Sequence, residues 1–141
     1  MNYNDITRHY FFAEERVGSL AGPDVIRGSA GSRAGGTWVQ FDLEWQRSDP
    51  AVGIGARAGA AGRRITNARF LAFGCPHTIA VAAWLVERAV VAAYAGVGLP
   101  EAVPLIARRF AVPTEKLGRL LLVEDAWLAA TPGSQGGAAV R

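Results

Sequence analysis

The hydrophobic period of this chain changes from two residues to about 3.6 residues at Gly74, and this change constrains the fold more than any other feature. The segment before it, ITNARFLAF (65–73), is apolar and strand-like. After it, apolar side chains recur at helical spacing from about Pro76 to Tyr94, where AGVGLP breaks the pattern. Because proline suits the first position of a helix, this order predicts that Cys75 caps the helix.

A second strand is indicated by the alternating segment TWVQFDLEW (37–45). Its side chains divide into an apolar set and a largely polar set on opposite faces. The apolar set is Val39, Phe41, Leu43 and Trp45, and the other set is Trp38, Gln40, Asp42 and Glu44. We expect a half-buried strand that runs antiparallel to residues 65–73 and turns the apolar set inward.

Helices are predicted on both sides of these strands. Residues 4–17 indicate a short helix, and residues 99–110 a helix that starts late or kinks at Pro104. The final helix is expected over residues 113–130, whereas the Gly- and Ser-rich residues 18–36 indicate a loop with at most one edge strand. This order predicts an α+β fold with helices packed on one face of a small antiparallel sheet.

The length of 141 residues and the 50% hydrophobic content are typical of one globular domain. We expect that domain to span residues 1–131, with a flexible hairpin insertion at 46–64 and a disordered tail at 132–141. The insertion contains GIGARAG (53–59), whose glycines superficially suggest a dinucleotide-binding turn. Because the spacing differs from that motif and no helical pattern follows, a mobile loop is the better interpretation.

Charge and apolar content argue against nucleic-acid and membrane partners. The formal net charge is +3, but every cation except Lys116 is arginine and no run reaches four basic residues. The longest apolar stretch, residues 79–97, contains Glu87 and Arg88, which would be costly inside a membrane. A polar N-terminus unlike a signal peptide and a single cysteine predict a cytoplasmic protein.

Cys75 is the residue that most strongly suggests chemistry. At a helix N-terminus its thiolate would be favoured and its pKa lowered. His77 offers a protonated partner or a second metal ligand, for example for zinc, but no carboxylate is placed beside His77 or His9. The alternative is that Cys75 is a small buried residue and His77 faces solvent. The residues alone support an activated thiol and leave this alternative open.

Three segments together resemble the N-terminal NifU/IscU family of iron–sulfur cluster assembly scaffolds. ARFLAFGCPHTIAVAAWLVE (68–87) is similar to the family's F-x-x-x-G-C-x-x-x-I-A region, and YNDITRHYFFAEERVGSL (3–20) to its opening helix and G-S-L segment. VPTEKLGRLLLVEDAWLAA (112–130) is similar to its closing L-P-x-x-K-L-H-C-S-x-L-A-E-D-A-x-x-A-A stretch. The resemblance implies a three-stranded antiparallel sheet with helices packed against it.

The family's ligand set is largely replaced in this chain. The resemblance implies that Cys75 is the middle of three ligand cysteines, with Lys116 retained near the cluster position. The other family ligand positions are substituted by Gly35, Thr37, Gly118 and Arg119. A guanidinium at a ligand position would repel iron. The cofactor of Cys75 therefore stays open between iron, an iron–sulfur cluster, zinc and none, and His77 would be the second ligand of a metal.

Two functions follow from this resemblance, and a third from the thiol alone. The first is a degenerate, non-enzymatic scaffold in which Cys75 handles sulfur or iron, with a cysteine desulfurase or another assembly protein as partner. The second is a partner-binding or regulatory module without chemistry, and the third, least supported, is a thiol enzyme that uses Cys75 and His77. The family's chaperone contact would fall on Val112–Lys116, whose sequence differs from the family pattern. The four tryptophans are expected in the core or in a homodimer interface.

Overall fold

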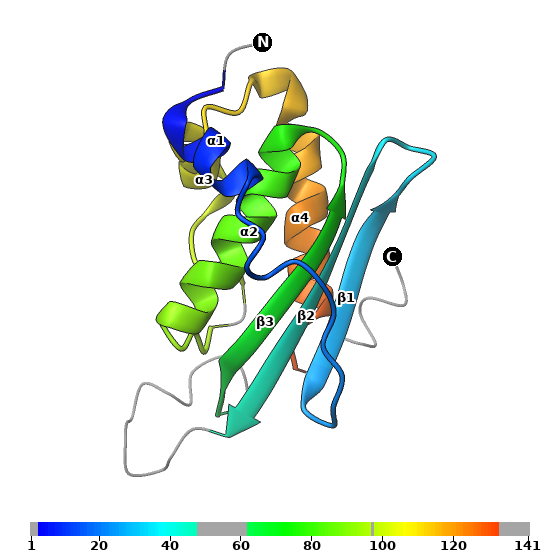
Figure 1. The fold of residues 1–141 in the computed structure, drawn as a ribbon, viewed down its shortest axis with the longest axis vertical. Coiled ribbons are helices and arrows are strands. Elements are labelled where there is room, and N and C mark those ends of the chain that lie inside the picture. Colours follow the sequence, from blue (N-terminus) through cyan, green and yellow to red (C-terminus); the bar gives the residue numbers. More distant parts are fainter. Residues whose placement is uncertain (1–2, 48–61, 97, 133–141) are drawn as a thin grey trace.

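The computed structural model describes residues 3–47, 62–96 and 98–132 as one three-stranded sheet with helices against it. The elements in chain order are α1 (Asp5–Phe11), β1 (Val25–Ser32), β2 (Thr37–Arg47), β3 (Arg63–Phe73), α2 (Pro76–Val91), α3 (Val103–Arg109), the 3-10 turn η2 (Thr114–Lys116) and α4 (Leu117–Ala129). Both strand pairs are antiparallel, and the sheet order is β1-β2-β3. The α+β fold with a three-stranded antiparallel sheet is therefore confirmed (Figure 1).

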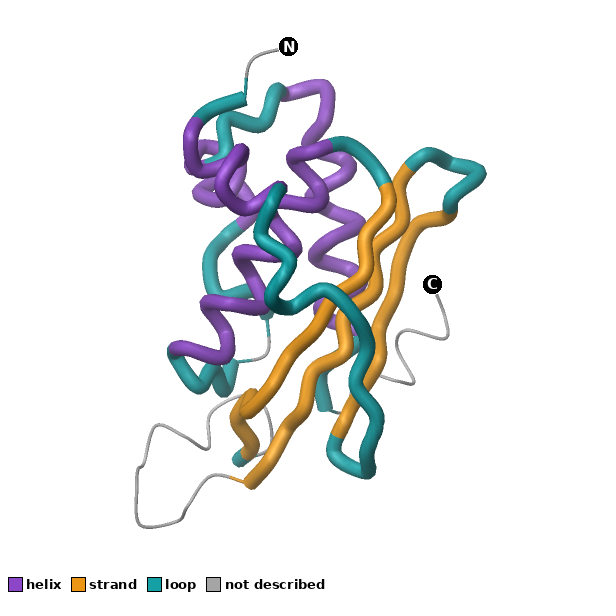
Figure 2. The backbone as a smooth tube through the Cα atoms, viewed as in Figure 1, coloured by secondary structure: helices purple, strands orange, loops and turns teal. Residues whose placement is uncertain are grey.

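The helices lie on one face of the sheet, as Figure 2 shows, and the core forms between the two layers. Helix α2 packs on β3, and α4 packs on β1 and β2. The predicted apolar set of β2, namely Val39, Phe41, Leu43 and Trp45, has no exposed surface. Trp84 and Trp127 are also buried in this core, whereas Trp38 is half-buried at one end of the sheet.

Gly28 lets α4 approach β1 closely. A Cβ atom at this position would lie 2.4 Å from the carbonyl oxygen of Ala126 and 2.5 Å from the amide nitrogen of Ala130. Both are backbone atoms of the α4 region, so a larger residue could be accommodated only by moving the helix away from the sheet.

The other face of the sheet is crossed by the chain between α1 and β1, which we name the crossing segment (residues 16–24). At the outer edge of β3, Val17 forms a parallel bridge with Phe70, and the Gly18 amide donates to the Phe70 carbonyl at 2.9 Å. At the centre, the Leu20 amide donates to Asp42 at 2.8 Å. The segment reaches β1 where the Trp45 amide donates to the Asp24 carbonyl at 2.9 Å.

The burial of Asp42 differs from the expectation that only the apolar face of β2 is buried. Asp42 lies on the polar face of β2, yet it has no exposed surface. The crossing segment covers it, and Arg27 on β1 donates two hydrogen bonds to its carboxylate, at 2.8 and 2.9 Å. A buried carboxylate needs such partners because its desolvation is costly.

Several predicted boundaries are corrected by the structure. The first helix ends at Phe11 rather than near residue 17, because the chain must turn there to reach the edge of β3. Helix α2 ends at Val91 rather than Tyr94, and α3 begins at Val103, directly before Pro104. The edge strand left open in residues 18–36 is present as β1.

Strands β2 and β3 take both ends of the predicted 46–64 insertion, which leaves it shorter than expected. Its centre, residues 48–61, and the predicted tail from residue 133 onward lie outside the described residues. None of the helices in the described ranges has the length and apolar content needed to cross a membrane.

Candidate functional site

Cys75 lies in the short connection between the end of β3 and the start of α2. Gly74 closes β3 with φ +150°, and a Cβ atom at this position would lie 3.4 Å from the Gly36 carbonyl oxygen and 3.6 Å from the Thr37 Cα atom. The tip of the β1–β2 hairpin is therefore adjacent to the start of α2. Cys75 occupies the predicted N-cap, with Pro76 as the first helical residue.

The Cys75 thiol is half-buried and surrounded by hydrogen-bond donors. Its Sγ lies 3.5 Å from the Thr78 hydroxyl oxygen. Burial raises the pKa of Cys75, but the polar groups around the sulfur lower it by more: the Thr78 hydroxyl and amide, the Arg119 guanidinium and the His77 amide. The pKa of Cys75 therefore lies below its usual value, and the thiolate is favoured.

Arg119 reaches this thiol from the first turn of α4, 44 residues further along the chain. Lys116, in the turn before α4, is close enough to His77 to act on its charge. The two cations and the N-terminus of α2 give the surroundings of Cys75 a positive potential. We name these residues, Cys75, His77, Lys116 and Arg119, the Cys75 cluster.

His77 is only 4% exposed, so the alternative in which it faces solvent is wrong. Its ring meets Tyr3 edge-on, with 4.8 Å between ring centroids. Burial lowers the pKa of His77. The positive charges of Lys116 and Arg119 lower it further, whereas the nearby Ala111 carbonyl raises it. The neutral imidazole is therefore favoured, and its Nδ1 has no hydrogen-bond partner within the described ranges.

The other positions that the resemblance assigns to ligands, Gly35, Thr37 and Gly118, lie at the same end of the molecule as Cys75. Gly35 is in the hairpin turn, where its amide donates to the Ser32 hydroxyl at 2.9 Å. Thr37 is buried beside Gly74. Gly118 is exposed in the first turn of α4, with open space where a side chain would be.

This donor set does not fit a metal ion or an iron–sulfur cluster. In the part of the chain that the structure describes, no three His, Cys, Asp or Glu side chains are grouped so that they could hold a metal. Stable zinc and iron–sulfur sites use about four protein ligands, most often thiolates. The Cys75 cluster offers one thiolate, a buried neutral imidazole and two cations. Such surroundings favour a small anion over a metal cation.

An arginine stacked on aromatic rings lies at the hairpin end of the sheet, close to the Cys75 cluster. The Arg33 guanidinium carbon lies 5.9 Å from the ring centroid of Trp38 and 5.5 Å from that of Phe73. These rings are cross-strand neighbours in β2 and β3, and Phe73 is 43% exposed. The sequence gives little sign of this patch, because Arg33 is in a Gly-rich turn and the strand pairing alone brings Trp38 to Phe73.

Comparisons with known proteins give a fold but no sequence relative. No family model matches the sequence, and no curated protein matches it. Among solved structures, the chain is similar to a protein of the thermophile Fervidobacterium islandicum AW-1, provisionally named an iron–sulfur cluster assembly scaffold for the SUF system. The TM-score is 0.52 over 91% of this chain and 95% of that one, at 12% sequence identity. At this identity the likeness shows the fold alone: the chain has the fold of an iron–sulfur assembly scaffold.

Proposed function

We propose that this protein acts in iron–sulfur metabolism as a scaffold-fold protein that accepts sulfur on Cys75 instead of assembling a complete cluster. The observation that carries the proposal is the placement of the only thiol of the chain at the N-cap of α2, beside the Thr78 hydroxyl and near enough to the Arg119 guanidinium for this cation to lower its pKa. An anionic sulfur species is stabilised by such surroundings, whereas iron is repelled.

The step we propose is a transfer of sulfane sulfur. The Cys75 thiolate attacks the terminal sulfur of a persulfide on a donor protein, and the donor's S–S bond breaks. The donor leaves as a thiolate, and Cys75 becomes a persulfide that carries the transferred sulfur with its proton. Charge is conserved because one thiolate is consumed and one is released. Arg119 and the amide groups at the start of α2 stabilise Cys75 in its reactive anionic form.

The fold of the structural neighbour supports iron–sulfur assembly proteins as the general class of partner. Within that class we propose a cysteine desulfurase as the sulfur donor in a reducing cytoplasm. Lys116, the second cation of the Cys75 cluster, would help to attract the anionic sulfur species. A chaperone contact at Val112–Lys116 and a homodimer that pairs two Cys75 thiolates stay predictions.

Sulfur transfer can be tested by incubating the protein without oxygen with a desulfurase and cysteine and then measuring its intact mass. We expect a mass increase of one sulfur atom that is reversed by reductant and absent from Cys75→Ser. Arg119→Gln should slow the transfer about tenfold, since it removes the charged donor. The control Arg47→Gln, at the opposite end of β2, should behave as wild type. Wild-type protein that takes up no sulfur would refute the proposal.

A second candidate function, partner binding without chemistry, is favoured by the Arg33–Trp38–Phe73 patch. Aromatic residues and arginine dominate the binding energy of protein interfaces. This function predicts that Phe73→Ala weakens capture of the desulfurase at least tenfold, whereas Cys75→Ala leaves capture unchanged. Capture that is lost in Cys75→Ala and kept in Phe73→Ala would contradict it.

A further inference from the structure

A second site is indicated by a pocket between the C-terminal end of α1 and α2, away from Cys75. It has a volume of about 330 Å³, within the usual range for small-molecule sites. Its walls come from α1, the linker before β1, β3 and α2. Glu87, one of its lining residues, follows Cys75 by 12 positions, which is roughly 18 Å along a helix. The pocket is therefore separate from the Cys75 cluster.

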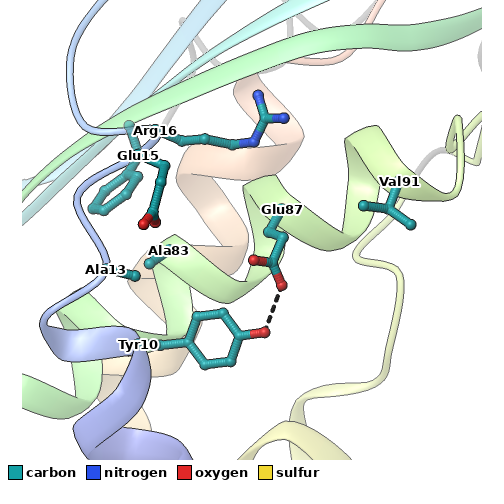
Figure 3. A pocket seen from close by; sticks show the side chains of 8 residues that line it. Tyr10, Ala13, Glu15, Arg16, Ala83, Glu87 and Val91 are labelled. Carbon is teal, nitrogen blue, oxygen red and sulfur yellow. Dashed lines mark hydrogen bonds between the residues drawn. The ribbon is translucent and has the colours of Figure 1, made fainter.

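Two carboxylates and one phenol converge on this pocket. Figure 3 shows Glu15 reaching from the linker toward α2, while Glu87 lies opposite and is joined to Tyr10. The Tyr10 hydroxyl donates to Glu87 Oε1 at 2.5 Å. This contact uses one oxygen of Glu87 and leaves the other to face the pocket.

Neither Glu15 nor Glu87 has an ion-pair partner among the residues that the structure describes. Arg16 also lines the pocket, but its guanidinium donates to the Asn67 amide oxygen at 3.2 Å. With two carboxylates against one guanidinium, the lining carries a net negative charge.

The rest of the lining is apolar. Phe70 and Ala83 are buried behind the carboxylates, and Val91 is 80% exposed at the rim. The wall that holds Glu15 is fixed to the sheet, because the Phe70 amide donates to the Arg16 carbonyl at 3.0 Å and Arg69 donates to the Glu15 carbonyl at 3.2 Å. The pocket is therefore formed before any ligand arrives, which lowers the entropic cost of binding.

We propose that this pocket binds a primary ammonium group carried on a short alkyl chain. The ammonium has three donors, which suit the free oxygen of Glu87, the Glu15 carboxylate and the lone pair of the Tyr10 oxygen. The alkyl chain would pack on Phe70, Ala83 and Val91. An alkyl carboxylate would be repelled by the same two glutamates.

The proposal is tested with n-butylammonium chloride as the probe, by calorimetry and by amide NMR shifts at constant ionic strength. We expect saturable binding that shifts the amide signals of residues around Tyr10, Glu15 and Glu87. Butyrate and butanol have the same carbon chain without the positive charge, and they should bind at least tenfold more weakly. Equal binding of butanol and butylammonium, or no saturation, would overturn the proposal.

Matched variants locate the site. Glu87→Gln and Glu15→Gln should each weaken butylammonium binding about tenfold, whereas Glu14→Gln, an exposed neighbour outside the pocket, should not. Glu15 is also exposed, so its variant keeps the test valid if Glu87→Gln fails to fold. Unchanged binding in both pocket variants would refute the assignment. Nα-acetyl-lysine methylamide has its only ammonium on the side chain. If it binds more tightly than butylammonium, a lysine side chain is the source of the ammonium, and the reverse would identify a free amine.

Discussion

The ionisation of Cys75 depends on a residue that is distant in sequence. Burial raises the pKa of the thiol, but Thr78 and the Arg119 guanidinium, among other donors, lower it by more. We therefore expect Arg119→Gln to raise the pKa of Cys75 toward its usual value and to slow alkylation by iodoacetamide near neutral pH. The rate of alkylation measured against pH gives this pKa directly. Arg47→Gln should leave the profile unchanged, and an identical profile in Arg119→Gln would contradict the role of the guanidinium.

Replacement by alanine is expected to have opposite effects on stability at Gly28 and at Gly118. Gly28→Ala places a methyl group against the backbone of the α4 region, so we expect it to destabilise the fold by about 1–3 kcal/mol. Gly118→Ala has open space around it in the first turn of a helix, and we expect it to stabilise the fold by about 0.4–1 kcal/mol. Urea denaturation of both variants measures the difference. Equal stabilities would show that α4 does not rest on Gly28.

At the residue scale the candidate site is only partly visible in the sequence. The order of Gly74, Cys75 and Pro76 is sufficient to predict an N-cap thiol, because capping depends on local conformation. The contact with Arg119 depends on how α4 packs against α2, which no local pattern encodes. The burial of His77 depends in the same way on Tyr3 from the other end of the chain.

At the scale of elements, α2 and α3 end in the same unusual manner. The Tyr94 amide donates to the Ala89 carbonyl at 2.9 Å and the Ala93 amide to the Val90 carbonyl at 3.2 Å, which is a Schellman motif. Its left-handed position, with φ 49°, is Ala93 instead of glycine. Ala111, with φ 53°, has the corresponding place after α3.

Ala93→Gly should therefore stabilise the protein by about 0.5–1 kcal/mol, because an L-residue is strained in this conformation. Ala92→Gly provides the control, since Ala92 has the right-handed φ of −86° and gains nothing from glycine. We expect thermal denaturation to give a higher midpoint for the first variant and a lower one for the second. A lower midpoint for Ala93→Gly would show that its conformation is not strained.

The elements with a strong hydrophobic period are the ones that the sequence predicts best. Strands β2 and β3 and helix α2 appear where their patterns place them, because each buries one continuous apolar face. The crossing segment has no such pattern, since single backbone contacts to Phe70 and Asp42 hold it in place. Its course over the sheet, and with it the burial of Asp42, could not be predicted.

At the scale of the whole molecule, the hydrogen bond from Tyr10 to Glu87 joins the N-terminal helix to α2 and makes the stability of the fold decrease at alkaline pH. Burial, together with the hydrogen bond to Glu87, raises the pKa of Tyr10 from 10.0 to about 12. The folded state therefore retains this proton more strongly than the unfolded state. The resulting stabilisation is complete below pH 10 and is lost as the pH rises from 10 toward 12.

We expect the urea midpoint of the wild type to fall more steeply than that of Tyr10→Phe over this range of pH. Titration of the remaining tyrosines and the lysine is common to both proteins and cancels in the comparison. Parallel curves for the two proteins would show that the Tyr10 proton is not linked to folding.

The docking of α1 has a consequence for how the chain is made. The Thr7 hydroxyl donates to the Phe110 carbonyl across 103 positions of sequence, and the side-chain amide Nδ2 of Asn4 donates to the Arg109 carbonyl across 105. During synthesis the N-terminal helix leaves the ribosome first, yet both of its acceptors are made only when more than three quarters of the chain exists. The apolar side chains of Ile6, Tyr10 and Phe11, which pack against the core in the folded protein, stay in solvent until the segments that cover them have been synthesised. The nascent chain therefore depends on fast elongation or on protection of this segment before the fold can close.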